Sequence, residues 1–481
     1  MNRRMIFNAV GMMLRVEAAL LLLPAITSAI YRESEAFAFL SAAVLGYAIG
    51  ILPKLLYKPK THVIYAKEGF IIVAFSWIML SLIGALPFII SGEIPRLADA
   101  FFETVSGFTT TGASILTDVE AHSHGVLFWR SFTHWIGGMG IIVFVTAIIP
   151  NVSERPIHIL RAEMPGPTMG KLVPRIKDTA VILYLIYMVM TVIETVLLCI
   201  GGMPFFESLL HSFGTAGTGG FGLKGNSIAG YSPYIQWIIG IFMVLFGVNF
   251  NLYYLIIIKK LKTAVKSREL WFFFAVIGIS TLLITFNIRY LFGNFSETLR
   301  TAFFQVASII STTGYATADF NTWPQFSRYL ILLLMFFGGC AGSTAGGMKM
   351  SRIMMLFKLI RNETQRLIHP RAVTSLRFEG KTVDGATSRN LSNYFFIYFV
   401  CLAVIVLLLC GEPFSFLTNF SAAVSCFNNV GPGLDAVGPA SNYAAYSDFA
   451  KYILSFAMLL GRLEIFPIII AFSPSAWLRN K

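Results

Sequence analysis

Charged side chains are scarce in this sequence, and their scarcity excludes a soluble protein. Only 13% of the 481 residues are Asp, Glu, Lys or Arg, whereas 56% are hydrophobic. A soluble domain could bury that much apolar surface only in a very large core. Runs of about 20 apolar residues are instead long enough to cross a hydrocarbon layer roughly 30 Å thick. The composition therefore predicts an integral membrane protein.

The residues that build disulfides, metal sites and catalytic sites are also few. The five cysteines lack paired spacing and the seven histidines are scattered, so we expect no disulfide framework, no metal site built from His and Cys, no resident cofactor and no enzyme. A G-x-G-x-x-G match at 217–222 follows no strand pattern, and a phosphate-loop-like stretch at 342–349 is out of register. Neither predicts a nucleotide site. Any nucleotide control must come from a partner.

The net charge of +13 has a distribution that argues against nucleic acid as a partner. Twenty-seven of the 37 Lys and Arg lie in alternate connections and at the termini, in the ranges 3–4, 54–67, 155–177, 259–268, 349–389 and 479–481. Basic residues gather on the cytoplasmic side of membrane proteins. We therefore expect a multi-pass membrane protein with both termini in the cytoplasm.

The apolar runs predict ten spans. They cover residues 6–30, 35–56, 69–92, 125–150, 178–202, 232–258, 270–292, 327–360 (interrupted), 391–411 and 446–475. After the first two, one pattern recurs four times: a long run, a short run, a polar glycine-bearing segment and a long run. The predicted units are a helix pair (1–66) and four repeats (67–176, 177–268, 269–388 and 389–481).

The short runs predict re-entrant helices. They cover residues 97–108, 204–215, 296–309 and 413–427. At about 1.5 Å per residue, twelve helical residues reach only some 18 Å, about half a bilayer. The negative ends of their dipoles would then lie beside the polar segments, where they favour a cation.

The four polar segments are the most informative feature of the chain. They are Thr109–Gly112, Ala216–Gly219, Ser311–Gly314 and Asn428–Gly431. Bare backbone at membrane depth is tolerated only inside protein or beside a wet cavity, and glycine permits the backbone angles that align successive carbonyls. Four such segments predict a four-sided pore in which carbonyls replace the water around a cation. Ordinary turns between helices are the alternative.

The eighth span contains a second glycine-rich stretch. Five glycines between Gly338 and Gly347 cost about 1 kcal/mol each relative to alanine in a helix, so the stretch is expected to unwind. It could obstruct a pore, or it could serve close helix packing. Arg462, inside the last span, could face the pore or pair with Glu464. Arg15, Glu17 and Glu194 receive no assigned role.

Several motifs resemble the Trk/Ktr/HKT superfamily of potassium transporters. They are SGFTTTGAS (106–114), TGGFG (218–222), STTGY (311–315) and FNNVGPG (427–433), and the motifs RAEMPGP (161–167), GGCAGSTAGGMK (338–349), HPRAV (369–373) and GRLEIFP (461–467) are similar to the bacterial TrkH/TrkG branch. The resemblance covers essentially the whole chain. It implies an all-α polytopic membrane protein: two N-terminal helices and four channel-like helix–pore-helix–filter–helix repeats around one pore.

The resemblance also implies roles for individual residues. The K+ filter would be built from Thr110, Thr111, Gly112, Gly217, Thr218, Gly219, Thr312, Thr313, Gly314, Asn429, Val430 and Gly431, which would hold K+ as the transported ion. The gate loop would contain Gly338, Gly339, Gly342, Ser343, Thr344, Gly346 and Gly347. Arg462 would act as an electrostatic barrier below the filter.

The implied function is K+ uptake by a homodimer, controlled by a cytoplasmic ring of TrkA-type nucleotide-binding subunits. Gated diffusion and symport with H+ or Na+ both stay open. Two other classes are weighed against this one. A carrier with inverted repeats conflicts with the charge pattern, which gives all four repeats one orientation, and no clustered catalytic side chains support a membrane enzyme or receptor.

Overall fold

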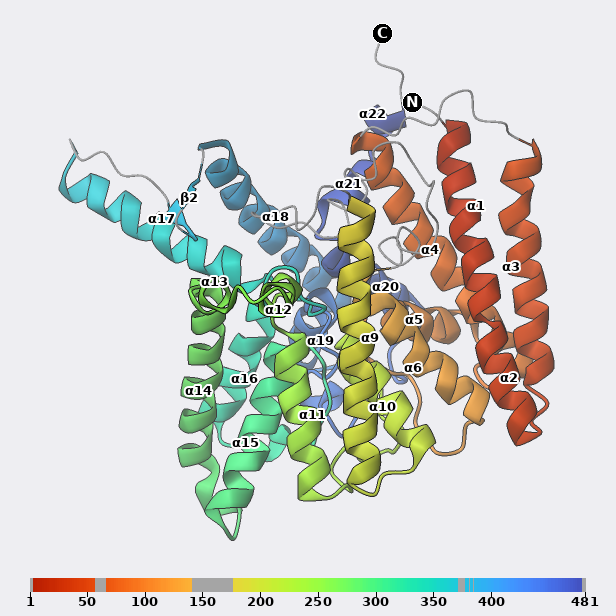
Figure 1. Ribbon diagram of the computed structural model, residues 1–481, viewed down its shortest axis with the longest axis horizontal. Coiled ribbons are helices and arrows are strands. Elements are labelled where there is room, and N and C mark those ends of the chain that lie inside the picture. The colour runs from red at the N-terminus through yellow and green to blue at the C-terminus, as the bar shows by residue number, and fades with distance from the viewer. Residues whose placement is uncertain are drawn as a thin grey trace.

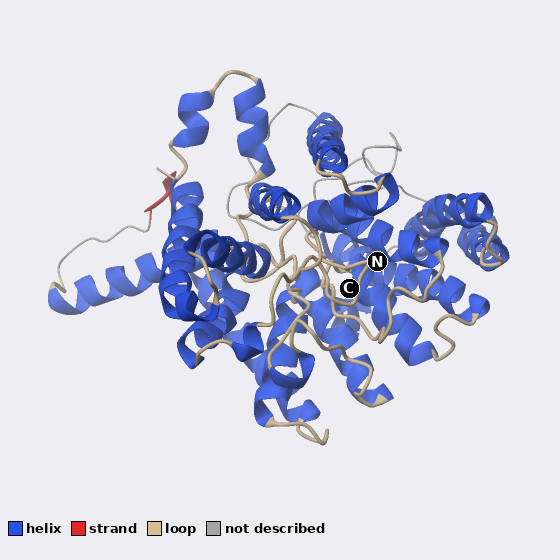
Figure 2. Ribbon diagram, turned by 90° about the horizontal axis from the view of Figure 1, so that it is seen from below, coloured by secondary structure: helices blue, strands red, loops and turns tan. Residues whose placement is uncertain are grey.

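The protein is an all-α polytopic membrane protein, and its elements surround a centre made of loops. A computed structural model describes residues 3–56, 66–140, 176–370, 377–379, 381–383 and 385–477. In these ranges the regular strands are β1 (Arg377–Phe378) and β2 (Lys381–Thr382), which pair antiparallel. Seen from below, helices surround a central gathering of loops (Figure 2). The RAEMPGP motif at 161–167 lies outside the described residues.

The N-terminal helices stand at one side of the molecule (Figure 1). They are α1 (Arg3–Leu20), α2 (Leu22–Tyr31) and α3 (Ala36–Leu56). Two glycines permit α1 and α3 to touch, because a Cβ at Gly11 or at Gly50 would lie 2.6 Å from the carbonyl oxygen of the other. Small residues at such crossings let helix backbones approach closely in a membrane.

Each predicted repeat contains the same three kinds of helix. The long first helices are α4 (Ala66–Ser91), α9 (Ile176–Ile200), α14 (Arg268–Ile288) and α18 (Gly385–Leu409). The short helices are α5 (Leu97–Phe108), α10 (Phe205–Gly217), α15 (Phe295–Ile310) and α19 (Phe416–Asn428). The second helices are α6 (His124–Gly138), α11 (Pro233–Phe246), α16 (Gln325–Phe337) and α20 (Asp448–Arg462). The boundaries between the repeats stay a prediction.

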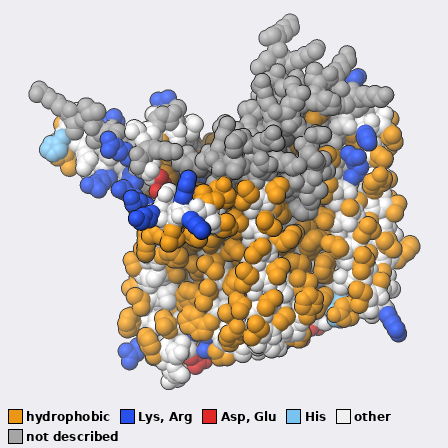
Figure 3. Space-filling model, in the orientation of Figure 1, with side chains coloured by type: hydrophobic (Ala, Val, Ile, Leu, Met, Phe, Trp, Pro, Cys, Tyr) orange, Lys and Arg blue, Asp and Glu red, His pale blue; other side chains and the backbone are white. Residues whose placement is uncertain are grey.

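The remaining elements lie between these helices or follow the last of them. They are α12 (Phe250–Ile257), α13 (Leu261–Val265), α17 (Met350–Ile368), α21 (Phe466–Phe472), α22 (Pro474–Trp477) and the 3₁₀ turns η1 (Arg289–Leu291), η2 (Phe320–Thr322) and η3 (Asp435–Val437). Hydrophobic side chains cover the middle of the molecule, and Lys and Arg gather along one border of that belt (Figure 3). An apolar belt of this kind fits a lipid-facing surface.

Two spans predicted to be continuous are sharply bent. The axes of α11 and α12 differ by 92°, and those of α20 and α21 by 118°. The second bend has a local cause, since Glu464 and Ile465 both have left-handed backbone angles (φ 55° and 71°) and Pro467 follows. The unbroken spans expected at 232–258 and 446–475 were therefore wrong. Among the described residues, six helices are long and apolar enough to cross a membrane, or eight if each bent pair is one span.

Candidate functional site

The four short helices end in the same backbone pattern. In each, one N–H bonds to the carbonyl three residues back: Thr110 to Gly107, Thr218 to Thr215, Thr312 to Ile309 and Asn429 to Cys426, at 3.0–3.3 Å. The next N–H bonds to the carbonyl five residues back: Thr111 to Ser106, Gly219 to Gly214, Thr313 to Ser308 and Val430 to Ser425, at 2.8–2.9 Å. The segments that follow are thus structurally equivalent, residue by residue.

Backbone angles fix which glycines correspond. The first residue of each pattern is left-handed: Thr110, Thr218, Thr312 and Asn429 have φ of 56–57°. Two positions later stands a glycine with positive φ: Gly112 (78°), Gly220 (71°), Gly314 (87°) and Gly431 (102°). The equivalent glycine of the second segment is therefore Gly220, and the predicted Gly217–Gly219 began one residue too early. Sequence analysis missed Gly220 because Gly219 and Gly220 are adjacent and either fits the pattern.

The four segments contact one another in a closed ring. A Cβ added at Gly112 would collide with the carbonyl oxygen of Gly219. The same holds around the ring, where Gly220 meets the oxygen of Thr313, Gly314 that of Val430, and Gly431 that of Thr111. The four oxygens come from equivalent positions. Each segment thus contacts the next in chain order, and the last contacts the first, so all four surround one axis.

Two cavities lie near the ring. The first, here called the glycine cavity, is lined by all four positive-φ glycines, Gly112, Gly220, Gly314 and Gly431. The second, here called the arginine cavity, is lined by Gly138, Gly346, Lys349 and Arg462 among others. The ring itself lines the first cavity, whereas the second is lined by Gly346 and Gly347, which bond to the third and fourth segments.

Hydroxyl and amide groups hold the segments in place. The hydroxyls of Thr109 and Thr111 lie 2.8 Å apart, and those of the equivalent Ser311 and Thr313 lie 2.7 Å apart. The Asn429 amide donates to the Thr111 hydroxyl at 3.0 Å and to a carbonyl of α20, that of Met458, at 2.9 Å. These bonds link the fourth segment to the first and close the ring.

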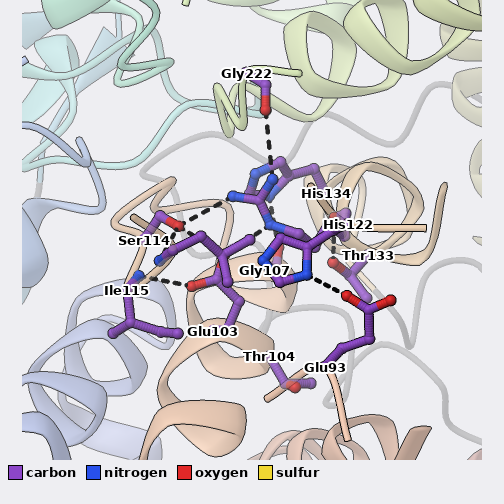
Figure 4. Close-up of polar contacts among 12 residues, drawn as sticks. Glu93, Glu103, Thr104, Gly107, Ser114, Ile115, His122, Thr133, His134 and Gly222 are labelled. Carbon is purple, nitrogen blue, oxygen red and sulfur yellow. Dashed lines mark hydrogen bonds and ion pairs between the residues drawn. The ribbon is translucent and has the colours of Figure 1, made fainter. Parts of the chain in front are cut away.

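A buried ion pair that sequence analysis missed supports the first two segments. The carboxylate of Glu103, on α5, accepts from Arg130 of α6 at 2.7 Å, and both side chains are almost fully buried. The same carboxylate accepts from the Ser114 hydroxyl and the Ile115 N–H, both at 2.9 Å (Figure 4). The Arg130 guanidinium also lies 3.9 Å above the Phe221 ring, beside the second segment. Two charged residues inside apolar helices were the signal that could have found the pair.

Removing one partner of this pair is expected to destabilise the protein strongly. Arg130→Met leaves the Glu103 carboxylate buried without its cation, which costs about 3–5 kcal/mol for such pairs. The measurement is thermal unfolding of purified protein in detergent. The double variant Glu103→Gln with Arg130→Met is the control, because replacing both charges avoids the uncompensated ion. A double variant as unstable as the single one would contradict the expectation.

A histidine lies between the first two segments. The Nδ1 of His134, on α6, lies 2.8 Å from the carbonyl oxygen of Gly107, and its ring centre lies 4.2 Å from that of Phe221. A Cβ at Gly219 would collide with the imidazole. The sequence alone showed His134 only as one of seven scattered histidines. In the structure it packs against the ring.

The glycine-rich stretch is unwound and lies against the ring. Helix α16 ends at Phe337, α17 begins at Met350, and the residues between them form no helix. Within this stretch the Gly346 N–H donates to the Thr312 hydroxyl at 2.6 Å, and the Gly347 N–H to the Asn428 carbonyl at 3.0 Å. Residues 338–349, here called the crossing loop, thus contact the third and fourth segments.

Arg462 joins the crossing loop to α6. Its guanidinium donates to the Thr344 carbonyl at 2.8 Å, to the Gly138 carbonyl at 2.8 Å and to the Gly137 carbonyl. The carboxylate of Glu464, the alternative partner of Arg462, pairs with Arg352 of α17. The arginine lines one cavity and binds the loop beside it. Glu17 and Glu194 are buried in α1 and α9 without an assigned role.

Comparisons with known proteins identify one family over nearly the whole chain. The family model TrkH, described as a cation transport protein, matches residues 35–481. The Trk system potassium uptake protein TrkH of Salmonella typhimurium is 37% identical over 99% of this chain and 100% of its own length. TrkG of Escherichia coli K12, also a Trk system potassium uptake protein, is 34% identical over 98% of both chains. The crystal structure of the potassium transporter TrkH from Vibrio parahaemolyticus superposes with a TM-score of 0.90 at 32% identity, covering 99% of this chain and 100% of that one.

Proposed function

Because this chain belongs to the TrkH family of cation transport proteins, we propose that it takes up K+ through the closed ring of its four glycine-bearing segments. The observation that carries the proposal is the cyclic contact of each glycine with the equivalent carbonyl of the next segment. Backbone carbonyls around one axis can replace the hydration shell of an alkali cation. The ends of four short helices, whose dipoles are negative there, add to the attraction.

The proposed filter consists of equivalent residues in all four segments. Its members are Thr110, Thr111, Gly112, Thr218, Gly219, Gly220, Thr312, Thr313, Gly314, Asn429, Val430 and Gly431, with Gly217 at its border. Hydroxyl, amide and backbone bonds fix these segments. A filter held in this way keeps its oxygens spaced for a dehydrated ion without collapsing on an empty site.

The crossing loop is the proposed gate, and Arg462 the proposed electrostatic barrier. The loop residues Gly346 and Gly347 bond directly to the proposed filter. Arg462 lines the arginine cavity that a cation would enter after the ring. A positive charge there repels cations until the loop and the arginine move together, which their shared bond at Thr344 supports.

We place the chain in the bacterial inner membrane with both termini in the cytoplasm. Basic residues at one border of the apolar belt support this orientation (Figure 3). Figure 1 shows α13 and α17 at that border, and the exposed basic residues on or beside these helices include Lys259, Lys262, Arg361 and Arg366. The membrane potential, about 2.3 kcal/mol per charge per 100 mV, then drives K+ inward. The basic border is the proposed docking face for a TrkA-type nucleotide-binding ring, and a homodimer is the proposed assembly.

Flux into vesicles tests the proposed function. Purified protein in liposomes should pass K+ when a membrane potential, negative inside, is imposed. The potential is set by a gradient of another ion, without the K+ ionophore valinomycin. Repeating the measurement with and without an H+ or Na+ gradient separates gated diffusion from symport. Saturable transport of an organic solute without K+ flux would overturn the proposal in favour of a carrier.

A further inference from the structure

A single carboxylate bonds to the crossing loop and to the first turn of the helix that follows it. Glu269 is the second residue of α14 and is only 6% exposed. One of its oxygens, Oε1, accepts from the Ala341 N–H at 2.8 Å and from the Ser351 N–H at 3.0 Å. Hydrogen bonds from backbone N–H groups to an ionised carboxylate are among the strong ones in proteins. One oxygen therefore joins the first part of the loop to the start of α17.

The start of α17 depends on this carboxylate for its cap. Lys349 occupies the N-cap position, with a left-handed φ of 64°, and its side chain makes no capping bond. The first N–H groups of a helix need acceptors from outside the helix. Glu269 supplies one from another element, so loosening Glu269 would weaken the hold on both the helix start and the loop before it.

A cytoplasm-side hairpin is bonded in turn to the start of α14. Glu379, in the turn between β1 and β2, accepts from the Arg268 N–H at 2.9 Å and from the Glu269 N–H at 3.1 Å. The same hairpin accepts from α17, where the Lys358 ammonium donates to the Arg377 carbonyl at 2.9 Å. The hairpin thus contacts the helix that carries Glu269 and the helix that follows the loop.

We propose that Glu269 is the positioning residue that holds the crossing loop across the conduction path, and that the β1–β2 hairpin is the point from which this hold is released. The inference rests on the proposed function, because it gives the gate its fixed end. A displacement of the hairpin would move α14 and α17 relative to one another, and Glu269 cannot keep both bonds when that happens. The loop would then be free to leave the ring.

A native cysteine reports the position of the loop. Cys340 lies within the loop and is 1% exposed. With Cys199, Cys401, Cys410 and Cys426 replaced by alanine, a membrane-impermeant cationic thiol reagent can be applied to inside-out vesicles. We expect Glu269→Ala to raise the modification rate of Cys340 about tenfold, since two hydrogen bonds to a buried carboxyl group are lost. K+ flux in vesicles without any partner protein should rise severalfold.

Two matched variants separate positioning from general stability. Glu269→Gln keeps an oxygen acceptor in the same place, so it should stay within about threefold of the parent in both measurements. Glu363→Ala removes an exposed carboxylate of α17 that pairs with Arg366 at 3.1 Å. This variant should change neither the reactivity of Cys340 nor the K+ flux. Glu379→Ala should change both in the direction of Glu269→Ala, because it releases the start of α14.

The contrary results are distinct. The positioning role would be overturned by a folded Glu269→Ala protein, judged by size-exclusion chromatography, that has parental Cys340 reactivity and parental K+ flux. A variant lacking residues 342–346 then tests whether the crossing loop is a gate. Raised K+ flux in that variant would support the loop as a gate, but without Glu269 as its positioning residue. Unchanged K+ flux would overturn both the gate and the positioning role.

Discussion

Replacing Gly112 by serine is expected to reduce K+ uptake to background in a K+-starved strain that depends on this protein. Gly112 has a φ of 78°, in the region that side chains with Cβ rarely adopt, and its Cβ would meet the Gly219 carbonyl oxygen. The left-handed angle alone costs roughly 1–2 kcal/mol. The collision adds more, because it can be relieved only by moving a backbone carbonyl of the proposed filter. The measurement is growth and K+ uptake at low external K+, with membrane expression checked by immunoblot.

Gly92→Ser is the matched control for this prediction. Gly92 has the same φ of 78°, but a Cβ there meets nothing within 4 Å. The control therefore carries the backbone strain without the collision, and uptake should stay close to that of the parent. Equal, near-parental uptake in both variants would show that the ring is not the conduction path. K+ passage with lost discrimination against Na+ in Gly112→Ser would still support the filter.

The repeated pattern could be predicted from the sequence because its causes are local. Polar residues and glycine after a short apolar helix are needed wherever backbone lies bare inside a membrane. The same reasoning predicted the unwound stretch between Gly338 and Gly347. The register predicted for the second segment is one residue off. The choice between Gly219 and Gly220 depends on which glycine faces the Thr313 carbonyl of another segment, and the local sequence does not show that.

Features that depend on distant parts of the chain could not be predicted in this way. Glu103 and Arg130 are 27 residues apart in sequence, and nothing local to either residue identifies its partner. Glu269 lies 72 residues before Ala341, the loop residue to which it bonds. The bend after α11 could not be predicted for a related reason: an apolar run fits a straight span, and a tertiary contact, the bond from the Phe250 N–H to the Gly342 carbonyl at 3.0 Å, stabilises the break.

Replacing Arg462 by methionine is expected to raise K+ flux about tenfold in vesicles without a partner protein. Two unit positive charges about 10 Å apart repel by about 1.7 kcal/mol at an effective dielectric constant of about 20, and 1.4 kcal/mol corresponds to about tenfold in rate. Methionine removes this repulsion and also the bonds to the Thr344 and Gly138 carbonyls. Flux is measured at a fixed K+ gradient.

Arg462→Lys separates the two contributions. Lysine keeps the positive charge, but its compact ammonium lacks the planar fork that lets one guanidinium reach carbonyls on two elements. If repulsion dominates, the lysine variant conducts like the parent while the methionine variant conducts faster. If tethering of the loop dominates, both variants conduct faster and Cys340 becomes reactive in both. Parental flux in a folded Arg462→Met protein would contradict both readings, since a charge on the conduction path cannot be removed without changing the barrier that a cation crosses.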